Sequence, residues 1–133
     1  MGVINTLKKF LFVLICALVL IFVGCSSNNL PINVRYQIYQ LGLEAIIITD
    51  QYLDMEIEVA EVDDKLNNLT KKFDEFDTIS FSELEIKGLI SSIRIVFNPV
   101  LYSDRIREKI NDEEVLERRN ILAKKLNQPL RDE

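Results

Sequence analysis

The chain has 133 residues, and its 21 acidic side chains outnumber its 16 basic ones, which gives a formal net charge of −5. It contains no histidine, so it has no imidazole base and no histidine ligand for a metal ion. The acidic excess also argues against nucleic acid as a partner, because binding to phosphate backbones depends on clustered Lys and Arg. The length is enough for one small domain.

The first residues of the chain have the pattern of an export signal. Two lysines precede an uncharged run from Phe10 to Val23, and this run ends at Gly24 and Cys25, after which the sequence becomes polar. The run is shorter than the roughly 20 apolar residues that span a bilayer, and its length is typical of the core of a signal peptide. We therefore predict that residues 1–24 form a signal peptide.

The end of this run, Phe22-Val23-Gly24-Cys25, resembles the lipobox of bacterial lipoproteins. In that family, diacylglycerol is attached to the cysteine thiol and the chain is then cut before the cysteine. The resemblance implies cleavage between Gly24 and Cys25, with lipid attachment at Cys25. Gly24 and Val23 fit the family pattern, whereas Phe22 departs from the usual leucine. The alternatives are an ordinary signal peptide with an incidental cysteine and a short uncleaved anchor.

A polar stretch separates the predicted anchor from the rest of the chain. We interpret residues 25–33 as the lipidated cysteine and a short tether, in which Pro31 keeps the chain out of a helix. Cys25 would be the only cysteine left after cleavage, so no disulfide could form. Three acyl chains would hold the protein firmly on a membrane, and the short tether would keep the folded part close to that surface.

Apolar side chains follow a heptad pattern from residue 34 to residue 76. Their spacing alternates between three and four residues without a break, which is typical of a helix that packs one face against another helix. We predict a single helix over residues 34–76, and we regard the seam as a candidate interaction surface. The seam consists of Ile38, Leu41, Ala45, Ile48, Tyr52, Met55, Val59, Val62, Leu66, Leu69, Phe73 and Phe76.

A second apolar stripe follows the first part of the same predicted helix, about 150° around its axis from the seam. Its members are Tyr36, Tyr39, Leu43, Ile46, Leu53, Ile57 and Ala60, with Asp50 as the only polar position. A helix that is apolar on two sides must be covered on both. The cover would come either from other helices of this chain or from an oligomer. Gly42 indicates either a close helix approach or a tolerated imperfection.

A second helix is predicted over residues 83–98. Ser82 and Glu85 have the spacing of a capping box, which marks the start of a helix. Asn98 and Pro99 end it, because the residue before proline avoids helical geometry.

A third helical region is predicted over residues 103–127, followed by a tail at residues 129–133. Asn111 and Glu114 form a further capping pattern, which would divide this region in two. The predicted fold is all-α, with a domain over residues 34–128. In it, the two shorter helical regions fold back on the long one as a small coiled-coil-like bundle.

The sequence offers little that would support catalysis. Acidic clusters occur at residues 54–58, 63–64 and 112–114, and we interpret them as solvated helix faces in preference to metal sites. A glycine-rich phosphate loop, a Cys-x-x-Cys pair and a nucleophile–base pattern are all missing from the sequence. We therefore predict no enzymatic activity, no metal, no cofactor and no small-molecule substrate.

Three functional hypotheses follow. The first is a lipid-anchored adaptor of a bacterial cell envelope that binds a partner protein, or a second copy of itself, through its helix faces. The second is an accessory of a phage-type lysis system, because the size, the composition and the predicted helices resemble those of spirochaete prophage holin-accessory proteins. The third is a surface lipoprotein that binds host molecules. Ser26 after the anchor cysteine favours the outer membrane or the cell surface over the inner membrane.

Overall fold

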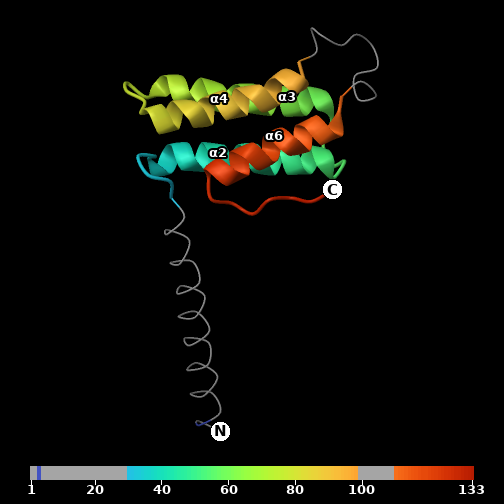
Figure 1. The fold of residues 1–133 in the computed structure, drawn as a ribbon, viewed down its shortest axis with the longest axis horizontal. Helices are drawn as coiled ribbons and strands as arrows, with labels where there is room; N and C mark the ends of the chain where they lie inside the picture. The colour runs from blue at the N-terminus through green and yellow to red at the C-terminus, as the bar shows by residue number, and fades with distance from the viewer. Residues whose placement is uncertain (1–2, 4–29, 99–109) are drawn as a thin grey trace.

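The computed structural model describes residues 30–98 and 110–133, together with Val3. Within these residues the fold is all-helical, as predicted, and its four α-helices pack side by side as a bundle in which successive helices run in opposite directions (Figure 1). The helices are α2 (Tyr36–Leu53), α3 (Val59–Lys72), α4 (Phe81–Val96) and α6 (Asp112–Lys125), and a 3₁₀ turn (Phe73–Glu75) follows α3.

The bundle has two halves, which are separated by the middle of each helix. Residues 30–44, 66–88 and 119–128 form the half from which the chain leads toward the predicted anchor, and we call it the tether half. Residues 45–65, 89–98, 110–118 and 129–133 form the far half. The start of α2 and the α3–α4 turn therefore lie together at one end of the molecule (Figure 1).

The prediction of one helix over residues 34–76 is wrong, because α2 ends at Leu53 and α3 begins at Val59. Met55 adopts a left-handed conformation, with a φ angle of 60°. Its N–H donates to the carbonyl of Tyr52 at 2.9 Å, and the N–H of Glu56 donates to that of Gln51 at 2.8 Å. These two bonds form a Schellman motif, which ends a helix. Glycine is the usual residue there, so methionine gives no sequence signal for this turn.

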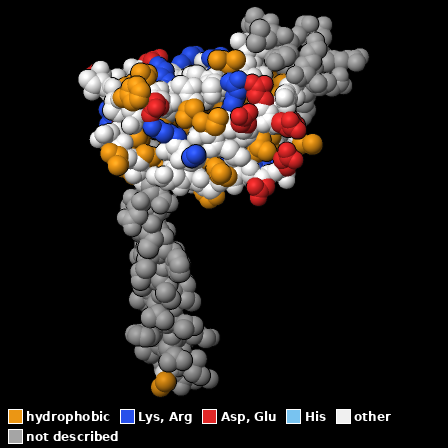
Figure 2. Space-filling model, viewed as in Figure 1, with side chains coloured by type: hydrophobic (Ala, Val, Ile, Leu, Met, Phe, Trp, Pro, Cys, Tyr) orange, Lys and Arg blue, Asp and Glu red, His pale blue; other side chains and the backbone are white. Residues whose placement is uncertain are grey.

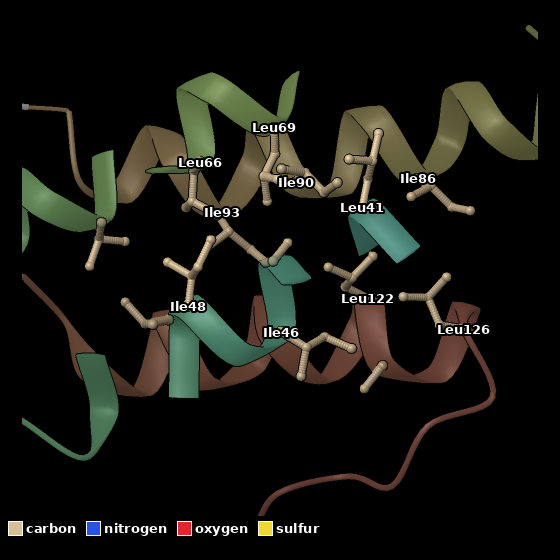
Figure 3. Close-up of a cluster of buried hydrophobic side chains, with 14 of the residues drawn as sticks. Leu41, Ile46, Ile48, Leu66, Leu69, Ile86, Ile90, Ile93, Leu122 and Leu126 are labelled. Carbon is tan, nitrogen blue, oxygen red and sulfur yellow. The ribbon is translucent and has the colours of Figure 1, made fainter. Parts of the chain in front are cut away.

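The heptad spacing nevertheless identified the core. Ten of the twelve seam residues are buried, Phe76 is half-buried, and Met55 alone is exposed, at 76 %. The side chains of the buried residues meet those of α4 and α6 in the middle of the bundle (Figure 3). Helices of the same chain therefore cover the seam, and the fold leaves it unavailable to a partner. The buried ten are Ile38, Leu41, Ala45, Ile48, Tyr52, Val59, Val62, Leu66, Leu69 and Phe73.

Helix α4 starts two residues before the predicted position. Its capping box is formed by Ser80 and Glu83, where we expected Ser82 and Glu85. The Glu83 N–H donates to the Ser80 hydroxyl at 3.2 Å, and the Ser80 N–H donates to the Glu83 carboxylate at 3.0 Å. Both pairs have the same spacing in the sequence, so only the fold distinguishes them.

Helix α6 covers the second part of the predicted third region. Asn111 is its N-cap and accepts hydrogen bonds from the N–H groups of Glu113 and Glu114, at 3.1 and 3.4 Å. The helix ends at Lys125, and Asn127, two residues later, has a left-handed conformation, which is common after a helix end. Residues 99–109, in which we placed the first part of this region, lie outside the described residues.

Gly42 lies where α2 approaches α6 closely. A Cβ atom at this position would lie 2.6 Å from Cδ1 of Leu126 and 3.4 Å from Cγ2 of Ile86. Leu126 and Ile86 are both fully buried. Of the two reasons considered for Gly42, the structure supports the close helix approach.

The last residues pack against the bundle, although the sequence suggested a plain tail. The Arg131 N–H donates to the Asn120 side chain at 2.9 Å, and the Asn120 amide donates to the Arg131 carbonyl at 2.8 Å. Arg119 donates to the carbonyl of Pro129 at 2.8 Å. The segment after α6 thus runs back along α6 toward the far half (Figure 1).

Candidate functional site at the tether half and along α4

An ion pair between a half-exposed arginine and a buried carboxylate fixes the point where the chain enters the bundle. The Glu83 side chain is 2 % exposed, and its carboxylate accepts two hydrogen bonds from the Arg35 guanidinium, both at 2.8 Å. It also accepts the backbone N–H of Arg35 at 2.9 Å. Arg35 is the N-cap residue of α2, so one carboxylate serves the N-termini of both α2 and α4. A negative charge is favourable at a helix N-terminus.

These hydrogen bonds hold the pKa of Glu83 well below its usual range. The Arg35 side chain lowers the pKa of Glu83 to about 2, with further contributions from the backbone N–H groups of Ser80 and Arg35, while burial opposes the shift. The carboxylate therefore stays ionised at any physiological pH. The ionised carboxylate holds the first turns of α2 and α4 together through Arg35, and it cannot act as a proton donor in catalysis. We call this Arg35–Glu83 pair the clamp.

The residues directly before α2 are already fixed to the bundle. The Ser80 hydroxyl donates to the carbonyl of Asn33 at 2.7 Å, and Val34 is buried. The Arg35 guanidinium donates to the carbonyl of Thr78 at 2.6 Å and lies 4.6 Å from the ring centre of Phe76. The loop between α3 and α4 thus holds the start of α2 from both sides.

A second polar network joins α2, α6 and the C-terminal segment. Arg119, which is largely buried, binds the two carboxylate oxygens of Asp50 at 3.0 and 2.9 Å. Arg131 donates to Asp54 at 2.6 Å and lies 3.4 Å from Asp50. The hydrogen bond from Arg131 lowers the pKa of Asp54. Asp50 is the only polar member of the second stripe, and its position in that stripe is explained by its ion pair with Arg119.

Helix α4 carries an apolar surface that the bundle does not cover. Phe81, Leu84 and Ile95 are 76 %, 55 % and 57 % exposed, and Gly88 lies between them on the same face. The positions follow a heptad spacing, which is typical of a face that packs on another helix. Within the described residues, no helix of the chain covers this face.

A shallow groove between α4 and α6 adjoins this face. Its volume is about 470 Å³, and its exposed surface is mostly apolar. A Cβ atom added at Gly88 would meet no atom within 4 Å, so the groove is open at that point. Ile121 on α6 is 47 % exposed, and Lys125 forms an ion pair with Glu85 at the edge. The groove is lined by Glu85, Gly88, Leu89, Ile121, Lys124 and Lys125.

The residues proposed for lipid attachment and signal cleavage, Cys25 and Gly24, lie outside the described residues. Three tyrosines of α2 differ in exposure, since Tyr39 and Tyr52 are buried and Tyr36 is 64 % exposed. The Tyr52 hydroxyl donates to Asp112 at 2.9 Å. These tyrosines therefore do not form a common surface.

At least one residue of each acidic cluster forms an ion pair. Asp63 binds Arg94 at 3.0 Å, Glu114 binds Arg118, and Asp54 binds Arg131. In residues 30–98 and 110–133, no three His, Cys, Asp or Glu side chains come together as a metal site would require. Every buried side-chain nitrogen or oxygen in that part of the chain has a hydrogen-bond partner.

Among the helices that the structure describes, none combines the length and the apolar composition that crossing a bilayer requires. Comparisons with protein-family models, with curated proteins and with solved structures gave no match for this chain.

The residues of the exposed face and groove of α4, among them Gly88 and Ile121, were not identified from the sequence. The spacing of Phe81, Leu84, Gly88 and Ile95 is a heptad signal that could have been read from the sequence. However, the buried face of α4 has an equally clear signal, and only the fold decides which of the two faces is covered.

Proposed function

We propose that the chain is a lipid-anchored, non-catalytic protein of a bacterial cell envelope that binds a partner protein beside the membrane. The anchor part of this proposal rests on the lipobox-like sequence that ends at Cys25. The heptad seam cannot supply the binding surface, because ten of its twelve residues are buried in the core. The binding part therefore rests on the exposed face and groove of α4.

The observation that carries the proposal is the open groove at Gly88. An apolar side chain from a partner helix would fit between Leu89 and Ile121, where glycine leaves room for it. Ile95, which is 57 % exposed on the same face, extends the apolar surface from the groove toward the far half, so a partner helix could lie along this part of α4. Anchoring would restrict this encounter to partners at the same membrane and raise their effective concentration.

The test is a pull-down of the tagged full-length protein from bacterial membranes in mild detergent. The variants are Cys25→Ala, which removes the anchor, and Gly88→Leu, which fills the groove. Because the added side chain would start in open space, Gly88→Leu is expected to fold. Ile47→Ser is the matched surface control, because Ile47 is 57 % exposed on α2, away from the groove.

We expect a lipid-modified Cys25 in the mass spectrum of the wild-type protein. We also expect a partner that binds the wild type and Ile47→Ser but is lost with Gly88→Leu. A partner that Gly88→Leu retains would contradict the assignment of the groove. An unmodified Cys25 would contradict the anchor.

A further inference from the structure

We infer that the end of the tether half lies against the membrane and inserts apolar side chains between lipid headgroups. This inference deepens the proposed function and rests on the lipid anchor at Cys25. Three features of the described residues support it: the exposed apolar side chains at that end, the length of chain that leads to Cys25, and the distribution of charge between the two halves.

The first feature is a cluster of exposed apolar side chains where the chain enters the bundle. Leu30 and Phe81 line one open depression, and Ile32 lies two residues after Leu30 in the chain. The exposed fractions in this cluster are 39 % for Leu30, 85 % for Ile32, 64 % for Tyr36, 76 % for Phe81 and 55 % for Leu84. Such a cluster on a protein surface indicates a binding site for another protein or for a membrane.

The second feature is the short connection to the anchor. Asn33 and Arg35 are fixed to the α3–α4 loop by hydrogen bonds, so this part of the chain cannot extend the tether. Leu30 is five residues after Cys25 in the sequence. Five residues span at most about 17 Å even when fully extended. A lipid on Cys25 therefore places the apolar cluster within reach of the headgroup region, and a bilayer surface is the occupant that this geometry favours.

The third feature is the uneven distribution of charge. The tether half contains seven basic and six acidic residues, whereas the far half contains four basic and thirteen acidic ones. Figure 2 shows the acidic side chains of the visible face gathered toward the far half. Bacterial membranes contain anionic lipids, which repel the far half and have little effect on the tether half. The charge thus favours the same orientation as the tether.

The ion pair of Arg35 with Glu83 gives this end the rigidity that the contact needs. Because the pair fixes the first turn of α2 to the first turn of α4, Ile32, Tyr36, Phe81 and Leu84 belong to one body. Tyr36 is suited to the membrane interface, where an aromatic ring meets lipid and its hydroxyl meets water.

The chain contains no tryptophan, so a single introduced tryptophan reports one position. We would compare Phe81→Trp in the tether half with Met55→Trp in the far half, because both native side chains are 76 % exposed. The full-length proteins, lipidated in bacteria, are reconstituted in vesicles of phosphatidylethanolamine and phosphatidylglycerol with brominated acyl chains. Bromine quenches the fluorescence of a tryptophan that contacts the lipid.

We expect quenching at position 81 to be several-fold stronger than at position 55, and Ile32→Asp in the Phe81→Trp protein to reduce it. Equal quenching at both positions in a protein with lipidated Cys25 overturns the inference and leaves the anchor intact. A mass spectrum without the lipid overturns the proposed anchor itself, and the inference with it. The two failures are therefore distinguishable.

Discussion

Helices α2 and α4 are both rich in apolar residues, yet they occupy opposite situations in the bundle. Most of the apolar positions of α2 are buried, because α3, α4 and α6 surround it and the C-terminal segment runs beside it. Helix α4 buries one face through Ile86, Ile90 and Ile93 and leaves Phe81, Leu84 and Ile95 exposed. An apolar stripe in a sequence therefore indicates that a helix face needs a cover, and says nothing of whether the chain itself supplies it.

The two glycines repeat this contrast on a small scale. Gly42 allows α2 to approach Leu126 of α6, whereas Gly88 opens a groove that no residue of the described chain fills. Glycine thus permits close helix packing inside the core at one position and leaves an open groove on the surface at the other.

The largest expected difference is between a leucine of the buried seam and a leucine of the exposed face. Leu66→Ala removes a side chain that is fully buried, and we expect it to lower the free energy of unfolding by about 2 to 5 kcal/mol. Leu84→Ala, at 55 % exposure, should cost less than about 1 kcal/mol. Urea denaturation followed by circular dichroism measures both. Equal losses would mean that the exposed face of α4 is covered in solution.

The next effect concerns the clamp between α4 and α2. Glu83→Gln removes a buried carboxylate that accepts hydrogen bonds from Arg35, and we expect a loss of about 2 to 3 kcal/mol at pH 7. Glu85→Gln is the matched control, because Glu85 is 42 % exposed and its pairing with Lys125 should contribute below about 1 kcal/mol.

The clamp also predicts a pH dependence. The pKa of Glu83 is lowered from its ordinary value of 4.5 to about 2 in the folded protein, so the carboxylate stabilises the fold fully above pH 4.5. The contribution is lost as the pH falls toward 2, and the difference between wild type and Glu83→Gln should shrink by about half near pH 3. A difference that stays constant from pH 7 to pH 3 would contradict the role of the charge.

A smaller pair of effects should have opposite signs. Gly42→Ala places a Cβ against Leu126, and the resulting strain should outweigh the gain in helix propensity, for a net loss of about 1 kcal/mol. Gly88→Ala meets no atom, so it should raise the free energy of unfolding by up to about 1 kcal/mol. Thermal and urea unfolding of the two variants test this contrast. Stabilisation by both substitutions would show that α2 and α6 do not pack closely at Gly42.

The smallest effect is expected at the turn that separates α2 from α3. Met55 has a φ of 60°, which glycine adopts without steric cost, so Met55→Gly should stabilise the protein by about 0.5 to 1 kcal/mol. Met55→Ala keeps the strain and should change stability little. If Met55→Gly were destabilising, the chain would not end α2 with this Schellman motif.

Several features of the protein follow from local sequence alone. The heptad spacing identified ten buried residues of α2, α3 and the 3₁₀ turn, and the side chain of Asn111 marked the start of α6. Apolar spacing and helix capping involve residues that are close together in the chain, so both can be recognised from the sequence. The proposed anchor at Cys25 is likewise inferred from the local sequence.

Tertiary structure decided the rest. The heptad pattern continues through residues 54–58, because Tyr52 and Val59 face the same core from two antiparallel helices as they would from one. Glu83 closes the capping box because its carboxylate also binds Arg35, which is 48 residues away in sequence. The sequence determined which side chains must be buried, since their periodicity is local. Only packing determined which helices bury them, and so which face of α4 stays exposed.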